Sequence, residues 1–397
     1  MKKNKLRMLF CSYGSNVPYD PMFLNRFATQ FETYLATFLP REQILDSNAK
    51  VILLRDFGRP LRHARINNLR IALSVFWRAI QIYRCVNATK PQVLVGSWVQ
   101  TYGLYAKLSK QKPFILFAYG SDILVDPARS PLHRAITIHV VKSADLVLID
   151  SEVQRRAVLS LGCLPQRIVS FPWFDEHALQ GVHSDRTFRN RLGWRRKLIV
   201  VCSRTHEPRY SVDTLIRAMP RVVQEAPDVR FLIFGRGSQT PQLIRLAHEL
   251  NVWPYVYFAG NAPRNQLLRY MKDCDLYVST SLSDGTSSSL LEAILLGVPV
   301  IVTAIEGNRE WITDGINGLM FPVRDTEQLA RAIVDLAKNP LERKSLQHAA
   351  RLGVKRRINW ESSSQELLDK MAMLYLDKRK IESSWRIGLG RHRILQL

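Results

Sequence analysis

Acidic residues are scarce in this chain of 397 residues, where 34 Asp and Glu stand against 57 Lys and Arg for a formal net charge of +23. So strong an imbalance indicates an anionic partner. Three classes fit: nucleic acid, an anionic membrane face, or a phosphorylated substrate. A P-loop and a recognisable RNA or DNA module are both missing, so a nucleic-acid-binding protein is favoured by charge alone and is not our expectation.

Cysteine is also sparse. The five cysteines are odd in number, scattered, and form no C-x-x-C pair. This pattern excludes a disulfide framework and a cysteine-based zinc site, and it is typical of a reduced cytoplasmic chain. The nine histidines show no convergent spacing with cysteines or carboxylates. We therefore expect neither a metal site nor a cofactor.

Long apolar runs are missing as well. The most apolar stretch, 290–305, is interrupted by Glu292, Gly297 and Pro299, and it is shorter than the roughly 18–20 residues that a spanning helix needs. The apolar segment at the N-terminus ends too soon for a signal peptide. Any membrane contact is expected to be peripheral, on the inner face of the cell membrane.

Short apolar runs alternate with longer amphipathic segments along the whole chain. This rhythm predicts an α/β fold with two tandem Rossmann-like, doubly wound domains facing a cleft. Helical patterns in the first half cover 20–38, 61–87 and 152–160. The predicted segments are a first domain (1–175), a basic linker (176–197), a second domain (198–358), a terminal helix that crosses back to the first domain (359–377), and a basic tail (378–397).

One loop and the helix after it carry the densest polar pattern, S-D-G-T-S-S-S-L-L-E-A-I-L-L-G, at 283–297. Small residues let backbone N–H groups approach a ligand, and the N-terminus of a helix favours an anion, so a phosphate fits there. Asp284 precedes the helix and Glu292 lies within it. The alternative is purely structural, with serines that cap the helix and a glutamate that complements its dipole.

The same stretch, with G-V-P-V-I-V-T, E-G-N-R-E and D-G-I-N-G-L-M-F-P after it, closely resembles the retaining nucleotide-sugar glycosyltransferases of family 4 (glycosyl transferases group 1), which have the GT-B fold. Upstream, V-V-C-S-R-T-H-E-P, F-L-I-F-G-R-G-S and V-Y-F-A-G-N-A-P follow the family in order and spacing. In the first half, P-F-I-L-F-A-Y-G-S-D resembles its acceptor-side domain.

The resemblance implies a metal-independent transfer of a sugar, with retention, from a nucleotide-diphosphate-sugar donor to a lipid-linked or cell-surface glycan acceptor. It makes Arg204 the diphosphate-binding cation, Asp284 the contact to the transferred sugar and Asp122 a residue that orients the acceptor or the donor sugar, and these three are the predicted catalytic residues. The alternative for Asp122 is a local role in turning the strand into the loop. Glu292 binds the donor ribose. The other donor-binding residues are Arg209, Tyr210, Gly235, Gly237, Asn261, Gly285, Thr286, Ser287, Ser288, Ser289 and Leu290.

The chain departs from the family in several places. Asp284 is one methylene shorter than the usual Glu, and Tyr119 replaces the usual histidine. Tyr210 replaces the usual lysine, and Arg209 precedes it. These departures leave a second hypothesis open, a catalytically degenerate relative that binds nucleotide sugar as a regulator.

The segment 55–84 holds seven arginines against one acid, with apolar residues at helical spacing. Two interpretations stand side by side: a basic amphipathic helix resting on anionic lipid, or a helix packed on its own sheet with a solvated basic edge.

Overall fold

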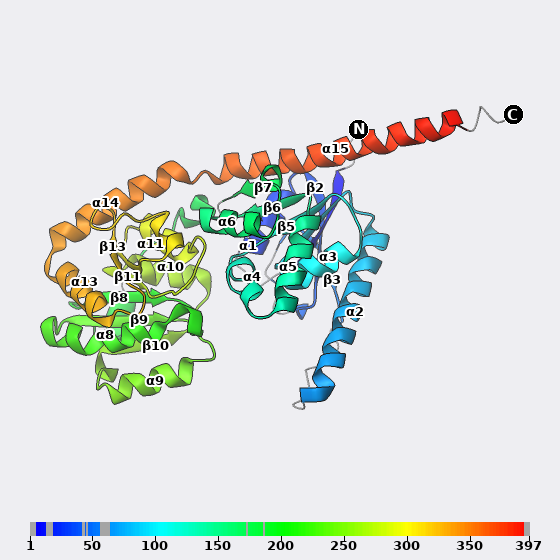
Figure 1. The fold of residues 1–397 in the computed structure, drawn as a ribbon. Coiled ribbons are helices and arrows are strands. Elements are labelled where there is room, and N and C mark those ends of the chain that lie inside the picture. The colour runs from blue at the N-terminus through cyan, green and yellow to red at the C-terminus, as the bar shows by residue number, and fades with distance from the viewer. Residues whose placement is uncertain are drawn as a thin grey trace. The chain divides into compact units, whose positions relative to one another are not determined.

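The computed structural model describes residues 5–12, 19–41, 44, 47–55, 64–171, 174–185 and 187–392 (Figure 1). The chain forms two compact units. Unit 1 comprises Met1–Asp150, Gln154–Pro172 and Glu361–Leu397, and unit 2 comprises Ser151–Val153 and Trp173–Trp360. Residues 13–18, residues 56–63 of the basic segment 55–84 and residues 393–397 of the basic tail lie outside the described residues.

Unit 1 is built on a parallel sheet of seven strands in the order β3-β2-β1-β4-β5-β6-β7. The strands are β1 (Leu6–Cys11), β2 (Phe31–Thr37), β3 (Lys50–Leu53), β4 (Val93–Ser97), β5 (Phe114–Phe117), β6 (Leu146–Ile149) and β7 (Ile168–Ser170). Every residue of β4, β5 and β6 is buried, as expected where helices cover both faces of a parallel sheet. The main helices are α1 (Tyr19–Phe27), α2 (Ala64–Thr89), α3 (Leu104–Leu108), α4 (Ser121–Leu124), α5 (Pro131–Ser143) and α6 (Glu152–Ser160).

Unit 2 has a parallel sheet of six strands in the order β10-β9-β8-β11-β12-β13. The strands are β8 (Leu198–Ser203), β9 (Val229–Phe234), β10 (Val256–Gly260), β11 (Leu276–Ser279), β12 (Val300–Thr303) and β13 (Leu319–Phe321). Its helices are α7 (Thr187–Arg191), α8 (Val212–Glu225), α9 (Thr240–Glu249), α10 (Arg264–Lys272), α11 (Ser288–Leu296), α12 (Glu306–Arg309), α13 (Thr326–Lys338) and α14 (Pro340–Arg357).

Successive side chains of the unit 2 strands enter two different cores. Along β8, Val200 and Cys202 join one buried cluster, whereas Ile199 and Val201 join the other. This alternation follows from the two-residue repeat of a strand, and it accounts for the uninterrupted apolar runs of the sequence. Two all-parallel sheets covered by helices confirm the predicted fold class.

One predicted element is wrong. The segment 20–38, expected to be helical, forms α1 and then, after a turn at Thr29 and Gln30, strand β2, which pairs with β1 and β3. Its apolar residues Phe23, Phe27, Phe31 and Leu35 recur every four positions. A spacing of four fits one face of a helix, but it is also even and therefore fits one face of a strand.

The last helix, α15 (Trp360–His392), begins at the end of unit 2 and groups with unit 1 from Glu361 onward. Near its start, Arg26 of α1 forms an ion pair with Glu361 at 2.8 Å and donates a hydrogen bond to Gln365 at 3.2 Å. Among the described helices, none has both the length and the apolar character that crossing a membrane requires.

Candidate functional site

The strand order of unit 2 fixes where a ligand is expected to bind. The order reverses between β8 and β11, which pair with each other, and open α/β sheets bind their ligands beyond the carboxyl ends of the strands at this reversal. The loop after β8 carries Arg204 and Arg209, and the loop after β11 carries Asp284. Two hydrogen bonds join these loops: Thr280 Oγ1 donates to the carbonyl of Tyr210 at 2.7 Å, and Leu282 N donates to that of Arg209 at 2.8 Å.

Arg204 is the centre of this site. One guanidinium nitrogen donates hydrogen bonds to the hydroxyls of Ser287 and Ser289 at 2.7 and 3.0 Å, and the other forms an ion pair with Asp284. Arg204 is only 8% exposed. Burial opposes its charge most strongly, but Asp284, helped by Tyr210, Tyr277 and Cys202, overcomes that effect, and the pKa of Arg204 is raised above its ordinary value. The site therefore holds a permanent cation, three of whose contacts come from the 284–289 loop.

The hydroxyls of Ser287 and Ser289 accept hydrogen bonds from Arg204. Ser287 occupies the N-cap position of α11, yet its side chain makes no capping hydrogen bond, and its hydroxyl accepts from Arg204 instead. Ser289 also bonds the phenol of Tyr277 at 2.8 Å. The helix begins at Ser288, and the alternative that the serines cap it does not hold for Ser287.

Tyr210 is shared by two arginines. The guanidinium carbon of Arg204 lies 4.2 Å from the centre of the Tyr210 ring, and that of Arg209 lies 4.8 Å from it. A cation over an aromatic face is attracted by the negative charge density of the ring. The tyrosine that stands in place of the family lysine thus brings no charge itself, but it brings a second cation close to the first.

Glu292 pairs with a residue that the sequence had not singled out. It is 7% exposed, and its Oε1 accepts from Arg264 Nε at 3.1 Å and from Nη2 at 2.8 Å. Burial raises the pKa of Glu292, and Arg264 opposes that shift. Arg264 is the first residue of α10, directly after N-A-P. An arginine there carries no spacing signal, so only the fold connects it to a carboxylate 28 positions away.

The predicted glycines meet protein backbone. A Cβ atom on Gly235, where φ is +111°, would lie 2.2 Å from the carbonyl oxygen of Arg204, and one on Gly237 would lie 2.5 Å from that of His206. A Cβ atom on Gly307 would lie 2.4 Å from the carbonyl oxygen of Gly285. These glycines let the loops pack closely around Arg204 and Asp284.

The remaining predicted donor residues divide into two groups. Thr286 Oγ1 accepts a hydrogen bond from Trp311 Nε1 at 3.2 Å, and Leu290 is fully buried in the core. Asn261, by contrast, is exposed, while Ser288 is partly exposed at the first turn of α11. The structure brings together Arg204, Arg209, Tyr210 and the 284–289 loop.

Asp122 belongs to unit 1 and has no exposed surface. Its carboxylate accepts backbone N–H bonds from Val99 at 3.1 Å, Tyr119 at 3.0 Å and Gly120 at 2.9 Å. Burial raises the pKa of Asp122 to about 7, and the three N–H bonds oppose the shift. The residue holds two loops together, so any orienting role that it has acts through them.

Two further features bear on the site. Over the residues that the structure describes, no group of three or more His, Cys, Asp or Glu side chains is placed to hold a metal ion.

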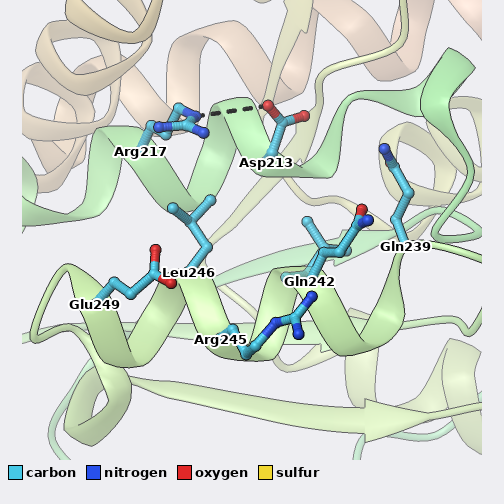
Figure 2. A pocket seen from close by; sticks show the side chains of 8 residues that line it. Asp213, Arg217, Gln239, Gln242, Arg245, Leu246 and Glu249 are labelled. Carbon is cyan, nitrogen blue, oxygen red and sulfur yellow. Dashed lines mark ion pairs between the residues drawn. The ribbon is translucent and has the colours of Figure 1, made fainter.

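A polar cavity of about 360 Å³ lies between α8 and α9, where Asp213 and Arg217 form an ion pair (Figure 2). None of the predicted donor residues lines it.

The close approach of Gly235 to Arg204 gives a test. We expect Gly235→Ala to lower the free energy of unfolding by about 2–4 kcal/mol, because the new methyl group clashes with a backbone carbonyl and the residue retains a positive φ. The matched control is Gly193→Ala, which also has a positive φ, +70°, but no atom within 4 Å of a Cβ. It should cost only about 1 kcal/mol. Urea denaturation measures both, and equal losses would contradict the packing role.

Comparison with known proteins places this geometry in a family. The family model "Glycosyl transferases group 1" matches residues 184–353, and the model "Glycosyl transferase 4-like" matches residues 48–151. A mannosyltransferase of Corynebacterium glutamicum, described as GDP-mannose-dependent and acting on monoacylated phosphatidylinositol monomannoside, is 28% identical over 216 residues, 50% of this chain and 56% of that protein. A related mannosyltransferase of Mycolicibacterium smegmatis is 29% identical over 195 residues, 45% of this chain and 50% of that protein.

Solved structures agree in fold. The Anabaena protein HepE in complex with UDP-glucose superposes with a TM-score of 0.74 at 16% identity, covering 93% of this chain and 100% of that one. Sucrose-phosphate synthase from Thermosynechococcus elongatus gives a TM-score of 0.79 at 16% identity, covering 94% and 100%. The chain spans about half the length of the curated relatives it matches. The two family models together match more than half of the chain, and it belongs to the glycosyl transferases of group 1, with the GT-B fold that the sequence resemblance predicts.

Proposed function

We propose that this chain transfers a sugar, with retention of configuration, from a nucleotide-diphosphate-sugar donor to a lipid-linked or surface glycan acceptor. The observation that carries the proposal is the Arg204 cluster at the reversal point of the unit 2 sheet. A buried permanent cation, a second arginine beside it and the N-terminus of α11 converge on the edge where such sheets bind ligands.

This cluster suits the chemistry of glycosyl transfer. The bond between the sugar and the diphosphate breaks through an oxocarbenium-like state, while negative charge builds up on the departing phosphate. Fixed cations aimed at that charge stabilise the transition state more than the ground state. In our proposal Arg204 and Arg209 supply this charge without a metal, and a departing phosphate oxygen takes the proton of the acceptor hydroxyl.

The two carboxylates have different tasks in this proposal. Asp284 is held by Arg204 before the donor binds, so the diphosphate competes with it for the guanidinium and Asp284 turns to the transferred sugar. Glu292 binds the ribose hydroxyls of the donor, and its ion pair with Arg264 opposes the rise in pKa that burial causes. Both carboxylates thus wait in ion pairs that the donor rearranges.

Donor binding is tested by a thermal-shift panel of UDP-, GDP-, TDP- and ADP-sugars. We expect at least one to raise the melting temperature of the wild type, since a ligand that binds only the folded state stabilises it. Arg204→Ala should lower the affinity for that nucleotide sugar about 100-fold, because hydrogen bonds to a charged group contribute about 1.5–3 kcal/mol to binding.

The control for this panel is Arg221→Ala, which removes an arginine paired with Glu225 and Glu327 on the surface of unit 2. It should leave donor affinity unchanged. If no nucleotide sugar shifts the wild type, donor binding is wrong. If a donor binds but is neither transferred nor slowly hydrolysed, the chain is a regulator and the enzymatic proposal is wrong.

We further propose that α2 rests on an anionic membrane surface. Its residues Leu73, Phe76 and Tyr83 lie on one face of the helix and are 52%, 65% and 51% exposed. Large apolar side chains gathered on a strongly basic protein are typical of contact with anionic lipid, where each cation near the surface contributes about 1 kcal/mol. A lipid-linked acceptor lies at such a surface.

Flotation with vesicles that contain anionic phospholipid tests this contact. We expect the wild type to float with the vesicles and Phe76→Glu to remain largely in the soluble fraction, because a charge replaces the most exposed apolar side chain of the face. Leu132→Glu is the matched control, since Leu132 is 67% exposed elsewhere in unit 1. Equal flotation of the wild type and Phe76→Glu would contradict the proposal.

A further inference from the structure

A second ligand edge exists in unit 1. Its strand order reverses between β1 and β4, so the same rule directs a ligand to the carboxyl ends of these strands and their neighbours. Trp98 directly follows β4, and Tyr119 lies two positions after β5. Their ring centres are 6.3 Å apart, with 41° between the ring planes. Both residues are partly exposed, and the two rings lie side by side at this edge.

The backbone of Trp98 is strained. Its φ of 58° and ψ of 100° lie outside the regions that a bulky residue favours. Strain of this kind persists where the surrounding structure enforces it, and it is concentrated at binding and active sites. The residue is followed by a π-helical turn, Val99–Gly103, another feature common at functional sites. Trp98 N donates to the carbonyl of Phe117 at 3.1 Å, and its own carbonyl accepts from Thr101 and Gly103.

Asp122 fixes the two ring-bearing loops together. One carboxylate oxygen accepts from Val99 N, next to Trp98, and the other accepts from the backbone N–H groups of Tyr119 and Gly120. Since the carboxylate is fully buried, it does not reach a ligand itself. Its effect is to set the spacing of the two rings.

The ring of Tyr119 is fixed from its far end as well. Its hydroxyl donates to Asp20 at 2.5 Å, and Ser12, at the end of β1, donates to the other oxygen of the same carboxylate. Asp20 has no exposed surface. Two buried carboxylates, those of Asp122 and Asp20, therefore fix the positions of Trp98 and Tyr119.

We infer that Trp98 and Tyr119 form the subsite that binds the ring of a polyol acceptor, a sugar or an inositol, and that Trp98 determines acceptor specificity. The inference rests on the proposed function. The C–H face of a polyol ring is apolar and packs on an aromatic face, while its hydroxyls need polar partners around the rim. A rigid aromatic pair suits such a ring because little conformational entropy is lost when it binds.

The test measures acceptor and donor kinetics separately, with phosphatidylinositol vesicles and free myo-inositol as acceptor probes and the donor that stabilises the wild type. We expect Trp98→Ala to raise the acceptor KM about tenfold, the size of a lost aromatic contact, while the donor KM stays within about twofold. Trp98→Phe, which retains an aromatic face, should fall between the wild type and Trp98→Ala. Trp253→Ala is the control, because Trp253 is 41% exposed in unit 2.

The outcomes separate the two proposals. A lower melting temperature and kcat with an unchanged acceptor KM in both Trp98 variants would make Trp98 a packing residue and overturn the inference. Donor hydrolysis by the wild type without transfer to either polyol probe would overturn it too, and would leave donor binding intact. A wild type that neither binds nor hydrolyses any donor overturns the proposed function itself.

Discussion

The contact of Arg204 with Asp284, Ser287 and Ser289 is the interaction around which unit 2 is arranged. A guanidinium that is 8% exposed is costly to bury unless its hydrogen bonds are supplied, and here the 284–289 loop supplies three. The arginine in turn fixes that loop, since Asp284 and the hydroxyls of Ser287 and Ser289 all contact it. Removal of this one cation would leave a partly buried carboxylate without its ion-pair partner.

Other features of the unit follow from the need to bring these loops close. Gly235 and Gly237 lie against the backbone of Arg204 and His206, and Gly307 lies against that of Gly285, at distances where a side chain would clash. The parallel strand order puts the loops after β8 and β11 at the same edge. The fold thus creates a charged site from segments that are 80 positions apart in the chain.

The sequence predicts the order of the elements, because parallel strands have continuous apolar runs. The specific motif after β11 also points to the residues that the structure gathers around Arg204. It mispredicts β2, since an apolar spacing of four fits a strand as well as a helix. It misses Arg264, whose partner Glu292 is distant in sequence and near only in the fold. The contacts that hold Trp98 and Tyr119 in place could not be predicted from the sequence either, because residue types reveal neither the backbone strain at Trp98 nor the burial of Asp20. The sequence predicts an orienting role for Asp122, whereas the structure shows its carboxylate accepting hydrogen bonds from backbone amides.

The central claim is that Arg204 forms an ion pair with Asp284 in the unliganded protein and exchanges this partner for the diphosphate when the donor binds. Calorimetric titration of Asp284→Asn with UDP and GDP tests it most directly. The account predicts that the nucleoside diphosphate that binds the wild type binds this variant about three- to tenfold more tightly, because a competing carboxylate worth about 1 kcal/mol is gone, while sugar transfer falls. Weaker binding of the diphosphate by Asp284→Asn, comparable to that of Arg204→Ala, would contradict it.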